Sequence, residues 1–409
     1  MRQKLLIVGG SYAAAEVASQ ARESGYGEDI VIVSEEAALP YHRPPLSKAY
    51  LKGHSDEAMP LKAAAFYSTN RIEFMLNTKV VCLEPGRNRA ELSNGAQIAF
   101  DTLVLAVGAR PRALACAGAD LGNVYYLRSI ADARLLKAAT AEAEKVVIIG
   151  AGFIGLEVAS ALMELQKQVT VVEAADRVLA RVVAPELSCF LSSVHAGRGV
   201  RLLTSRTVRS LVGESGLVHQ VLLDDGTALH ADAVIVGIGS VPNLELAGQL
   251  GLFSKNGIVV DSRSRTSRPN VFAAGDCALF RGPFNSGDAR LESVQNATDQ
   301  SRVAGAVIAG VDRAYDALPW FWSDQYDLKL QIAGLPFGAT ESIVRPGTTS
   351  DLSVFHFRDD TCVCVESVNR PREHVSARRL LSREKITKRD LQDVDFDISA
   401  VLKRFSISR

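Results

Sequence analysis

A glycine turn between an apolar strand and a helix occurs twice in this chain, and this duplication constrains the fold more than any other feature. In the first copy, apolar residues 4–8 lead into Gly9 and a helix-like segment. In the second copy, residues 145–149 lead into Gly150 and a similar segment. Such a turn places free N–H groups of a helix start against a dinucleotide pyrophosphate. We therefore predict two dinucleotide-binding domains.

The two copies stay parallel beyond their turns. Each has a second apolar strand that ends in an acid, Glu35 in the first copy and Glu173 in the second. Each then has a pair of residues typical of a hairpin turn, residues 94–95 and 225–226. An apolar strand that closes on glycine follows in both copies, and in the second copy this glycine is Gly239. One isolated glycine motif would be weak evidence, whereas two matched series indicate a repeated fold.

The glycine pattern is complete only in the second copy. There, Gly150, Gly152 and Gly155 allow a tight turn, close approach of a pyrophosphate and close helix–strand packing. The first copy keeps Gly9 but has Ser11 and an alanine at the other two positions. Alanine is an accepted third residue, while Ser11 leaves the backbone path of the first turn open.

The two acids predict how the nucleotides are bound. A carboxylate at the end of the second strand accepts hydrogen bonds from ribose hydroxyl groups, which is the role we expect for Glu35 and Glu173. Glu173 would also repel a 2′-phosphate, which favours NADH over NADPH. Arg177 lies four residues further on and leaves open the alternative that it turns toward such a phosphate.

Length and charge narrow the function. The 409 residues are enough for two or three domains. Balanced totals of 46 basic and 46 acidic residues argue against binding of nucleic acids or membrane surfaces through bulk charge. We find no stretch of about 20 apolar residues that could span a membrane. The apolar start ends in a glycine turn, not in a cleavage site, so we expect a strand there and a cytoplasmic protein.

The six cysteines do not predict redox or metal chemistry. None forms a C-x-x-C pair and no Cys/His cluster has metal-ligand spacing, so we expect no metal site. Cys362 and Cys364 alternate within one apolar segment, where a strand would bury both on the same face. A neighbouring dithiol is the alternative.

Four motifs together resemble those of flavoprotein ferredoxin reductases that serve bacterial oxygenases, the family of putidaredoxin reductase. The motifs are the Pro-rich residues 40–48, the turn and helix 150–157, the strand and acid 271–276, and the Trp-rich residues 318–326. The resemblance covers essentially the whole chain. It implies an α/β fold with two Rossmann-like domains, one for FAD and one for NAD, plus a smaller α+β C-terminal interface domain. The implied boundaries are 1–112 and 244–317 for a split FAD domain, 113–243 for the NAD domain and 318–409 for the C-terminal domain.

The same resemblance assigns roles to individual residues. Lys48 is expected near the flavin and paired with Glu157, which positions the nicotinamide, and these two are the predicted catalytic residues. Asp276 would accept from the ribityl chain, and the N–H of Val294 would bond the flavin at a helix start. Arg128 either reaches the cofactor or pairs with an acid four residues on. The predicted cofactor contacts are Gly9, Ser11, Ala13, Glu35, Arg43, Lys48, Val80, Arg128, Gly150, Gly152, Gly155, Glu157, Glu173, Gly239, Asp276 and Val294.

The implied reaction is transfer of electrons from NADH through FAD to a small, acidic 2Fe–2S ferredoxin, which feeds a cytochrome P450-type or Rieske-type oxygenase. Lys62 and Arg302 fall at the family's ferredoxin-docking places. The cation-rich segment 370–389 is read instead as a solvated face, because acids follow it directly. We expect a monomer or a weak dimer.

Three alternatives stay open. A rubredoxin reductase is a close variant that the sequence does not separate from a ferredoxin reductase. A redox-sensing flavoprotein related to apoptosis-inducing factor shares the two-domain plan. A cysteine-based NADH oxidase or peroxidase does as well, but residues 44–47 carry no thiol where that chemistry would need one.

Overall fold

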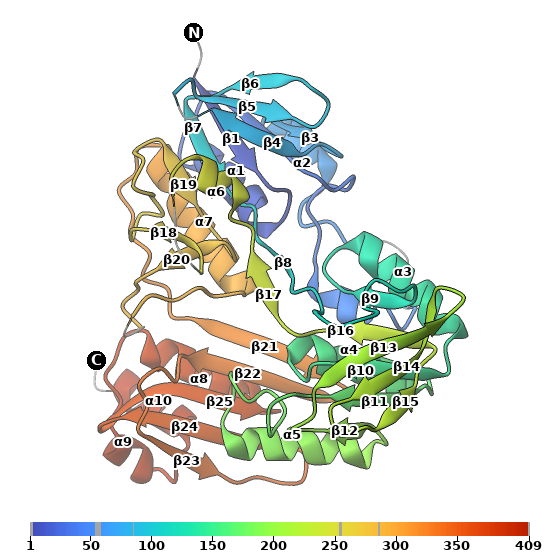
Figure 1. Cartoon of the computed structure of the whole chain (residues 1–409). Helices are drawn as coiled ribbons and strands as arrows, with labels where there is room; N and C mark the ends of the chain where they lie inside the picture. The colour runs from blue at the N-terminus through green and yellow to red at the C-terminus, as the bar shows by residue number, and fades with distance from the viewer. Residues whose placement is uncertain (1–2, 54–58, 85, 253–255, 285–286, 408–409) are drawn as a thin grey trace. The chain divides into compact units, whose positions relative to one another are not determined.

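The computed structural model describes residues 3–53, 59–84, 86–252, 256–284 and 287–407, and they form two compact units (Figure 1). The first unit comprises residues 1–42, 59–110 and 241–321. The second comprises residues 43–58, 111–240 and 322–409. The Pro-rich segment after residue 42 therefore groups with the second unit. The domain boundaries implied by the family resemblance stay a prediction.

A five-stranded parallel sheet forms the centre of the first unit, with the strand order β19-β7-β1-β2-β3. Strands β1, β2, β7 and β19 are short, largely buried apolar runs, as parallel strands covered by helices usually are. The edge strand β3 is less buried and carries the exposed Glu73. The strand bounds are β1 (Lys4–Val8), β2 (Asp29–Val33), β3 (Ile72–Met75), β7 (Thr102–Leu105) and β19 (Val271–Ala273).

Residues far apart in the sequence complete this unit. Strand β19 pairs with β7, so the chain returns to the first sheet after the segment that builds the second. Helices α1 (Tyr12–Glu23) and α7 (Val294–Ile308) pack closely, because Gly305 brings its Cα against α1: an added Cβ would lie 2.6 Å from the Val17 carbonyl oxygen. The remaining elements are α2 (Ala64–Thr69), β4 (Val80–Glu84), β5 (Arg89–Leu92), β6 (Gln97–Ala99), α6 (Glu245–Gln249), β18 (Ile258–Val260) and β20 (Ala278–Phe280), with β8 (Ala109–Pro111) and β17 (Ser240–Pro242) at the boundary of the units.

The second unit repeats the same plan. Its parallel sheet has the order β12-β11-β10-β16-β9, in which β10, β11 and β16 occupy the places of β1, β2 and β7. The predicted hairpin turns are confirmed in both copies, between β5 and β6 and between β14 and β15. The bounds are η1 (Pro44–Ser47), β9 (Val124–Tyr126), α3 (Ile130–Glu142), β10 (Lys145–Ile149), α4 (Phe153–Glu164), β11 (Gln168–Val172), α5 (Pro185–Gly197), β12 (Arg201–Leu203), β13 (Val208–Glu214), β14 (Leu217–Leu223), β15 (Ala228–His230) and β16 (Ala233–Val236).

One detail of the predicted repeat is shifted by a residue. Gly9 donates to the carbonyl of Val33, and Gly150 donates to that of Val172, so these two strand ends correspond. The residue after each strand is Ser34 in the first copy and Glu173 in the second. Glu35 therefore lies one residue beyond the position of Glu173. The sequence alone did not show this shift, because only the pairing register fixes where each strand ends.

An antiparallel sheet forms the C-terminal part of the chain, with the order β21-β22-β25-β24-β23 (Figure 1). Helices α8 and α10 pack against each other, and α8 also packs on β22 and β25. The predicted strand around Cys362 and Cys364 is confirmed as β25, which buries both thiols. The bounds are β21 (Trp320–Gln325), β22 (Leu328–Gly334), β23 (Glu341–Arg345), β24 (Leu352–Arg358), β25 (Thr361–Val368), α8 (Pro371–Leu381), α9 (Lys388–Gln392) and α10 (Ile398–Ile407).

Burial of His374 on α8 predicts that the C-terminal domain loses stability in acid. The side chain is 2% exposed, and burial together with the nearby charge of Arg378 lowers the pKa of His374 to about 4. Below the ordinary histidine pKa of about 6.5, the unfolded chain binds a proton that the folded protein does not. The contribution of His374 to the free energy of unfolding is therefore fully present above pH 6.5 and falls by about 2 kcal/mol by pH 5.

The comparison of two variants tests this expectation. Denaturant unfolding is followed by amide exchange in α8. Between pH 7.5 and 5, the free energy of unfolding should fall more in the wild type than in His374→Met. His219→Gln, at an exposed strand position, serves as the control and should behave as the wild type. Equal losses in the wild type and His374→Met would refute the assignment.

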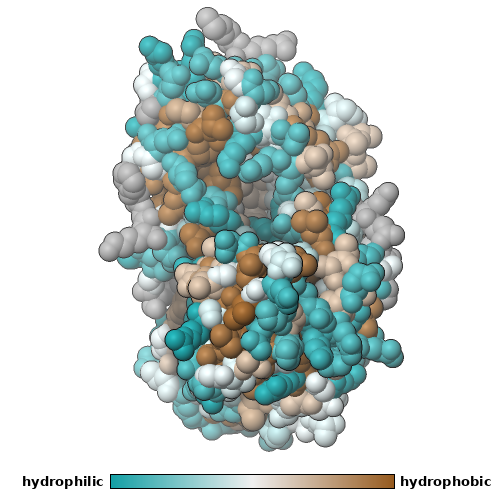
Figure 2. All heavy atoms as spheres, turned by 45° about the vertical axis from the view of Figure 1, so that its right-hand side comes forward, coloured by the Kyte–Doolittle hydropathy of each residue, from teal (hydrophilic) through white to brown (hydrophobic). Residues whose placement is uncertain are grey.

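The surface is mixed in character. Figure 2 shows hydrophilic side chains over most of the face in view, with hydrophobic ones between them. Large exposed hydrophobic residues such as Leu135, Leu217 and Val259 come from different elements. Across the described ranges, no helix combines the length and apolar character needed to cross a membrane.

Candidate nucleotide and electron-transfer site

The second glycine turn has two positions that the fold itself restricts to glycine. Gly150 has a φ of +103°, and a Cβ there would lie 2.4 Å from the Gly237 carbonyl oxygen. A Cβ at Gly155 would lie 2.1 Å from the carbonyl oxygen of Gly150. Gly152 differs, since the nearest atom to an added Cβ is 3.9 Å away. Packing does not require a glycine at 152, and the open space before α4 fits a pyrophosphate at the helix N-terminus.

The first turn closes in the same way despite Ser11. Gly9 has a φ of +120°, and an added Cβ would lie 2.1 Å from the Ala106 carbonyl oxygen. Ser11 is the N-cap of α1, with an extended backbone (φ −126°), and Gly152 is the N-cap of α4 in a similar conformation (φ −77°). Neither N-cap needs a positive φ. The serine therefore leaves the path of the turn intact, and the first copy also fits a dinucleotide.

Three predicted flavin contacts lie at one end of the first sheet. A Cβ on Gly275 would come 3.3 Å from the Cβ of Ala13 and 3.6 Å from that of Ala297, so the starts of α1 and α7 meet the end of β19. Asp276 follows Gly275 directly, and Val294 is the first residue of α7. The structure thus brings Ala13, Asp276 and the N-terminal turn of Val294 together beside the Gly9 turn.

Glu35 lies near the start of strand β4, because its side chain pairs with Lys79, the residue before Val80. The Glu35 side chain is 71% exposed, and its Oε1 atom lies 3.5 Å from Lys79 Nζ. Val80 follows Lys79 and is buried at the start of β4. An exposed carboxylate beside a buried strand start is accessible to ribose hydroxyls, and its ion pair is weak because both groups are solvated.

Lys48 and Glu157 form a buried ion pair in the second unit. Lys48 Nζ lies 2.6 Å from Glu157 Oε2, and Ser47 Oγ donates to the same oxygen at 2.5 Å. Ser323 Oγ donates to the other oxygen, Oε1, at 2.7 Å. Glu157 is 5% exposed on α4, so three donors compensate for the loss of water around its charge. The pairing that the family resemblance implied is therefore present.

Arg43 and Arg128 are also neighbours within the second unit. Arg43 Nη1 donates to the backbone carbonyl of Arg128 at 2.7 Å. The backbone N–H of Arg128 donates to Asp132, which forms a capping box with Ser129 at the start of α3. Asp132 thus serves as a helix cap. The structure joins Arg128 to Asp132 through the backbone, and the predicted cofactor role of the Arg128 side chain stays a prediction.

The carboxylate of Glu173 is held in place by backbone groups. Its Oε2 accepts from the Ala151 N–H at 2.7 Å and its Oε1 from the Ala175 N–H at 2.8 Å. Arg177 uses its guanidinium on the carbonyls of Val183 and Ala180, at 3.0 and 2.7 Å. Arg177 is therefore committed to its own loop, which weakens the alternative that it binds a 2′-phosphate.

Gly239 lies three residues after the end of strand β16 and has a left-handed backbone, with a φ of +98°. A Cβ there would meet Arg181 Nη2 at 3.6 Å, so the restriction at this position comes from the backbone conformation. The carbonyl of Gly239 accepts the N–H of Arg112 at 2.9 Å. Its predicted contact with the nucleotide stays a prediction.

The two predicted docking cations share one acid in the first unit. Glu16 on α1 lies 3.7 Å from Lys62 Nζ and 3.1 Å from Arg302 Nε. The three side chains form a patch with one excess positive charge, which we call the Glu16 patch. By contrast, cations of segment 370–389 pair inside the C-terminal domain, Arg370 with Asp351 and Lys388 with Glu341. This agrees with reading that segment as a structural, solvated face.

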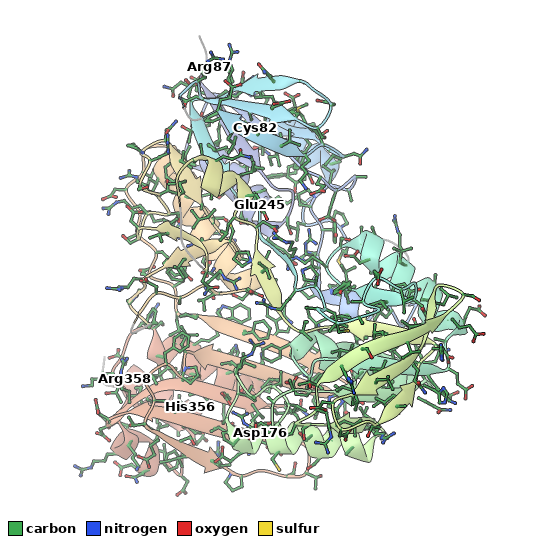
Figure 3. All side chains as sticks on the ribbon, viewed as in Figure 1. Cys82, Arg87, Asp176, Glu245, His356 and Arg358 are labelled. Atoms are coloured by element: carbon green, nitrogen blue, oxygen red, sulfur yellow. The ribbon has the colours of Figure 1, made fainter. Side chains whose placement is uncertain are left out.

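One cluster of potential metal ligands escaped the sequence analysis. His356 on β24 (Figure 3) lies beside Cys364 and Glu366 of β25, with their ligand atoms within 4.8 Å of one another. His356 pairs with Cys364 across the two antiparallel strands, a proximity that sequence spacing does not show. Glu366 accepts the N–H of Ala184 at 3.0 Å and lies 3.1 Å from His356 Nε2, so it anchors the start of α5. The expected absence of a metal site stays a prediction.

Sequence reasoning missed the serines around Glu157. Ser47 and Ser323 both lie in motifs that were singled out, yet neither was given a role. The signal for Ser323 is the polar alternation of the Trp-rich motif, since Ser323 and Gln325 share the buried face of β21 while Trp320 and Trp322 lie on the other. Buried polar residues on one strand face must find partners.

Comparison with known proteins agrees with this geometry. The family model described as "Pyridine nucleotide-disulphide oxidoreductase" matches residues 3–301, and one described as "Reductase C-terminal" matches residues 320–402. Rhodocoxin reductase from Rhodococcus erythropolis is 42% identical over 98% of this chain and 94% of its own length. Rubredoxin-NAD(+) reductase from Pseudomonas putida is 39% identical over 90% of this chain and 96% of its own. The putidaredoxin reductase in a covalent complex with putidaredoxin superposes with a TM-score of 0.94 at 37% identity, covering 98% of both chains.

Proposed function

Since the chain belongs to the pyridine nucleotide-disulphide oxidoreductase family, we propose that it passes electrons from NADH through FAD to a small 2Fe–2S ferredoxin that supplies a cytochrome P450-type or Rieske-type oxygenase. The protein is an oxidoreductase, and FAD and a nicotinamide nucleotide are the cofactors of its family. The observation that carries the proposal is the occurrence, twice in one chain, of the same parallel sheet with a glycine turn.

The chain's own residues mainly bind and orient. When bound, FAD supplies the ability to accept two electrons as a hydride and to release them singly. The Gly9 turn, Asp276 and the start of α7 would hold FAD, all of them within the first unit. The roles of Arg43, Lys48 and Arg128 toward FAD rest on the family resemblance. The Gly150 turn and Glu173 would hold NADH. Hydride transfer needs close placement of the reacting rings and little side-chain chemistry.

Lys48 and Glu157 have the clearest proposed roles. The Lys48 ammonium would supply a fixed positive charge to the flavin site, where such a charge favours reduction electrostatically. Glu157 holds this ammonium through its Oε2 atom and is proposed to position the nicotinamide. A buried carboxylate that binds one cation and two hydroxyls is well suited to hold one fixed orientation.

Replacement of Glu173 should change cofactor preference. Glu173→Ala removes the acceptor for ribose hydroxyls and the charge that repels a 2′-phosphate, so the preference for NADH over NADPH should fall about 10-fold or more. Steady-state kcat/KM values with each nucleotide measure this ratio. Glu186→Gln, an exposed acid on α5, is the control. An unchanged ratio in Glu173→Ala would remove Glu173 from the proposed specificity site.

Neutralising the Glu16 patch should weaken ferredoxin binding. Lys62→Ala and Arg302→Ala are each expected to raise the KM for a ferredoxin about 2- to 5-fold at low salt, because exposed charges steer acidic partners. Glu16→Gln should lower the KM, since it removes the acid that the two cations share. Arg206→Ala, which removes another cation paired with an acid, is the control. If KM does not respond to salt or to these variants, ferredoxin docks elsewhere.

The alternatives differ in their expected partner and turnover. A rubredoxin reductase is favoured by the similarity to the Pseudomonas putida relative of that name. A sensor of the apoptosis-inducing-factor type would retain the nucleotide and reduce ferredoxin poorly. A cysteine-based oxidase is disfavoured, because residues 44–47 carry no thiol where that chemistry would need one. Burial also raises the pKa of Cys277 to about 11 and of Cys362 to about 12, which disfavours their reactive thiolate forms.

A panel assay separates these functions. The protein is loaded with FAD and mixed with NADH and, in turn, 2Fe–2S ferredoxins and rubredoxins. We expect fast reduction of at least one ferredoxin and slower reduction of rubredoxins. Preference for rubredoxins would support the alternative, and reduction of neither would support a sensor. The cytoplasmic location expected from the sequence remains part of the proposal.

A further inference from the structure

A buried line of hydrogen bonds leads from Glu157 into the C-terminal part of the second unit. Ser323 Oγ donates to Glu157 Oε1 at 2.7 Å, and Gln325 Nε2 donates to Ser323 Oγ at 3.1 Å. Gln325 Oε1 lies 2.9 Å from His195 Nε2, and His195 Nδ1 lies 3.3 Å from the hydroxyl of Tyr326. The line joins helices α4 and α5 to strand β21 and the turn that follows it.

The acid at one end determines the direction of every hydrogen bond in this line. A carboxylate paired with an ammonium can only accept, so Ser323 must use its one proton toward Glu157. Ser323 Oγ then accepts a hydrogen bond from the amide N–H of Gln325. The amide oxygen of Gln325 therefore faces His195. That oxygen requires a proton on His195 Nε2, and Nδ1 is left as the acceptor for the Tyr326 hydroxyl.

We propose that Ser323, Gln325 and His195 are positioning residues that hold Glu157 in place through a one-directional hydrogen-bond chain, in which His195 is neutral and carries its proton on Nε2. The proposal rests on the role proposed above for Glu157 and adds the residues that orient it. Hydrogen bonds aligned in one direction polarise one another, so the chain reinforces the donor that reaches Glu157.

The surroundings support a neutral histidine. His195, Ser323 and Gln325 are buried, with exposed fractions of 0%, 0% and 1%. Burial lowers the pKa of His195 from its ordinary value, and burial raises the pKa of Tyr326 to about 12, so the phenol keeps the proton that it donates. At the outer end, the Arg198 guanidinium lies over the Tyr326 ring at 5.0 Å and pairs with Asp327 at 2.7 Å.

The tautomer of His195 is the direct test, and it requires no enzyme assay. The full chain with ¹⁵N-labelled histidine is examined by NMR at pH 7.5, and His195 is assigned by loss of its signals in His195→Gln. We expect the neutral tautomer with the proton on Nε2. A proton on Nδ1, or a doubly protonated ring, overturns the proposal even if the enzyme is active.

Rates of flavin reduction test the effect on Glu157. Ser323→Ala and His195→Leu should lower the limiting rate of flavin reduction by NADH about 2- to 10-fold, with unchanged flavin content. His195→Gln keeps an N–H toward Gln325 and should recover most of the rate. Ser192 lies one turn earlier on α5 and outside the hydrogen-bond chain, so Ser192→Ala should match the wild type.

The two readouts separate this inference from the proposed function. Wild-type rates in both Ser323→Ala and His195→Leu would overturn a positioning role, even with the expected tautomer. If NADH fails to reduce the wild-type flavin, the proposed function fails. The tautomer of His195 still tests the hydrogen-bond chain in that case.

Discussion

Lys48→Met is expected to slow flavin reduction by NADH about 100-fold, the largest loss that we predict for a single side chain outside the glycine turns. The substitution keeps the length of the side chain and removes the charge 2.6 Å from Glu157 Oε2. It therefore removes both the proposed electrostatic stabilisation and the partner that holds Glu157. Stopped-flow measurement of the flavin band at saturating NADH gives the rate.

The same substitution should also destabilise the second unit, because it leaves a buried carboxylate without its cation. Breaking a buried pair typically costs about 3–5 kcal/mol, and partial exposure of Lys48 places the expected loss at the lower end. The double variant Lys48→Met/Glu157→Gln should recover stability but not the rate. Recovery of the rate in the double variant would mean that Lys48 acts only by neutralising Glu157. Lys52→Met, which breaks the more exposed pair with Glu164, should leave the rate unchanged.

Gly152→Val is expected to weaken NADH binding at least 100-fold while the protein still folds and binds FAD. The nearest atom to a Cβ at this position is 3.9 Å away, so the fold has room for a first side-chain atom. The side chain would occupy the space before α4 that fits the pyrophosphate, and it would block approach to the free N–H groups. The dependence of the flavin-reduction rate on NADH concentration, followed by stopped flow, measures the apparent affinity.

Two further substitutions control for folding. Gly150→Ala should destabilise the second sheet itself, since its Cβ would lie 2.4 Å from the Gly237 carbonyl and φ is +103°. Ser11→Gly should change little, because Ser11 already occupies the matching N-cap in an extended conformation. Tight binding of NADH by Gly152→Val would contradict placement of the nucleotide at this turn.

The duplicated sheet was predictable because each strand and turn carries a local signal. Apolar runs end in glycines with φ values that other residues avoid, as at Gly9 and Gly150. The hairpin turns likewise depend on adjacent residues. The exact equivalence of Ser34 and Glu173 was not predictable, because it depends on the pairing register between strands.

Contacts between distant segments required either the fold or the family resemblance. The Lys48–Glu157 pair was anticipated only through the resemblance, since 109 positions separate the two residues (157 − 48). The contact of Ser323 with Glu157 and that of His195 with Gln325 were not anticipated, because such polar side chains are common and their partners lie elsewhere in the sequence. The grouping of His356 with Cys364 and Glu366 was missed for the same reason.

Anaerobic mixing of the FAD-loaded protein with NADH and then with oxidised 2Fe–2S ferredoxin tests the central claim most directly. We predict that the oxidised flavin band disappears on mixing with NADH, and that it returns as two ferredoxin molecules are reduced for each NADH consumed. A protein that binds no flavin, or a flavin band that NADH leaves unchanged, would contradict the account.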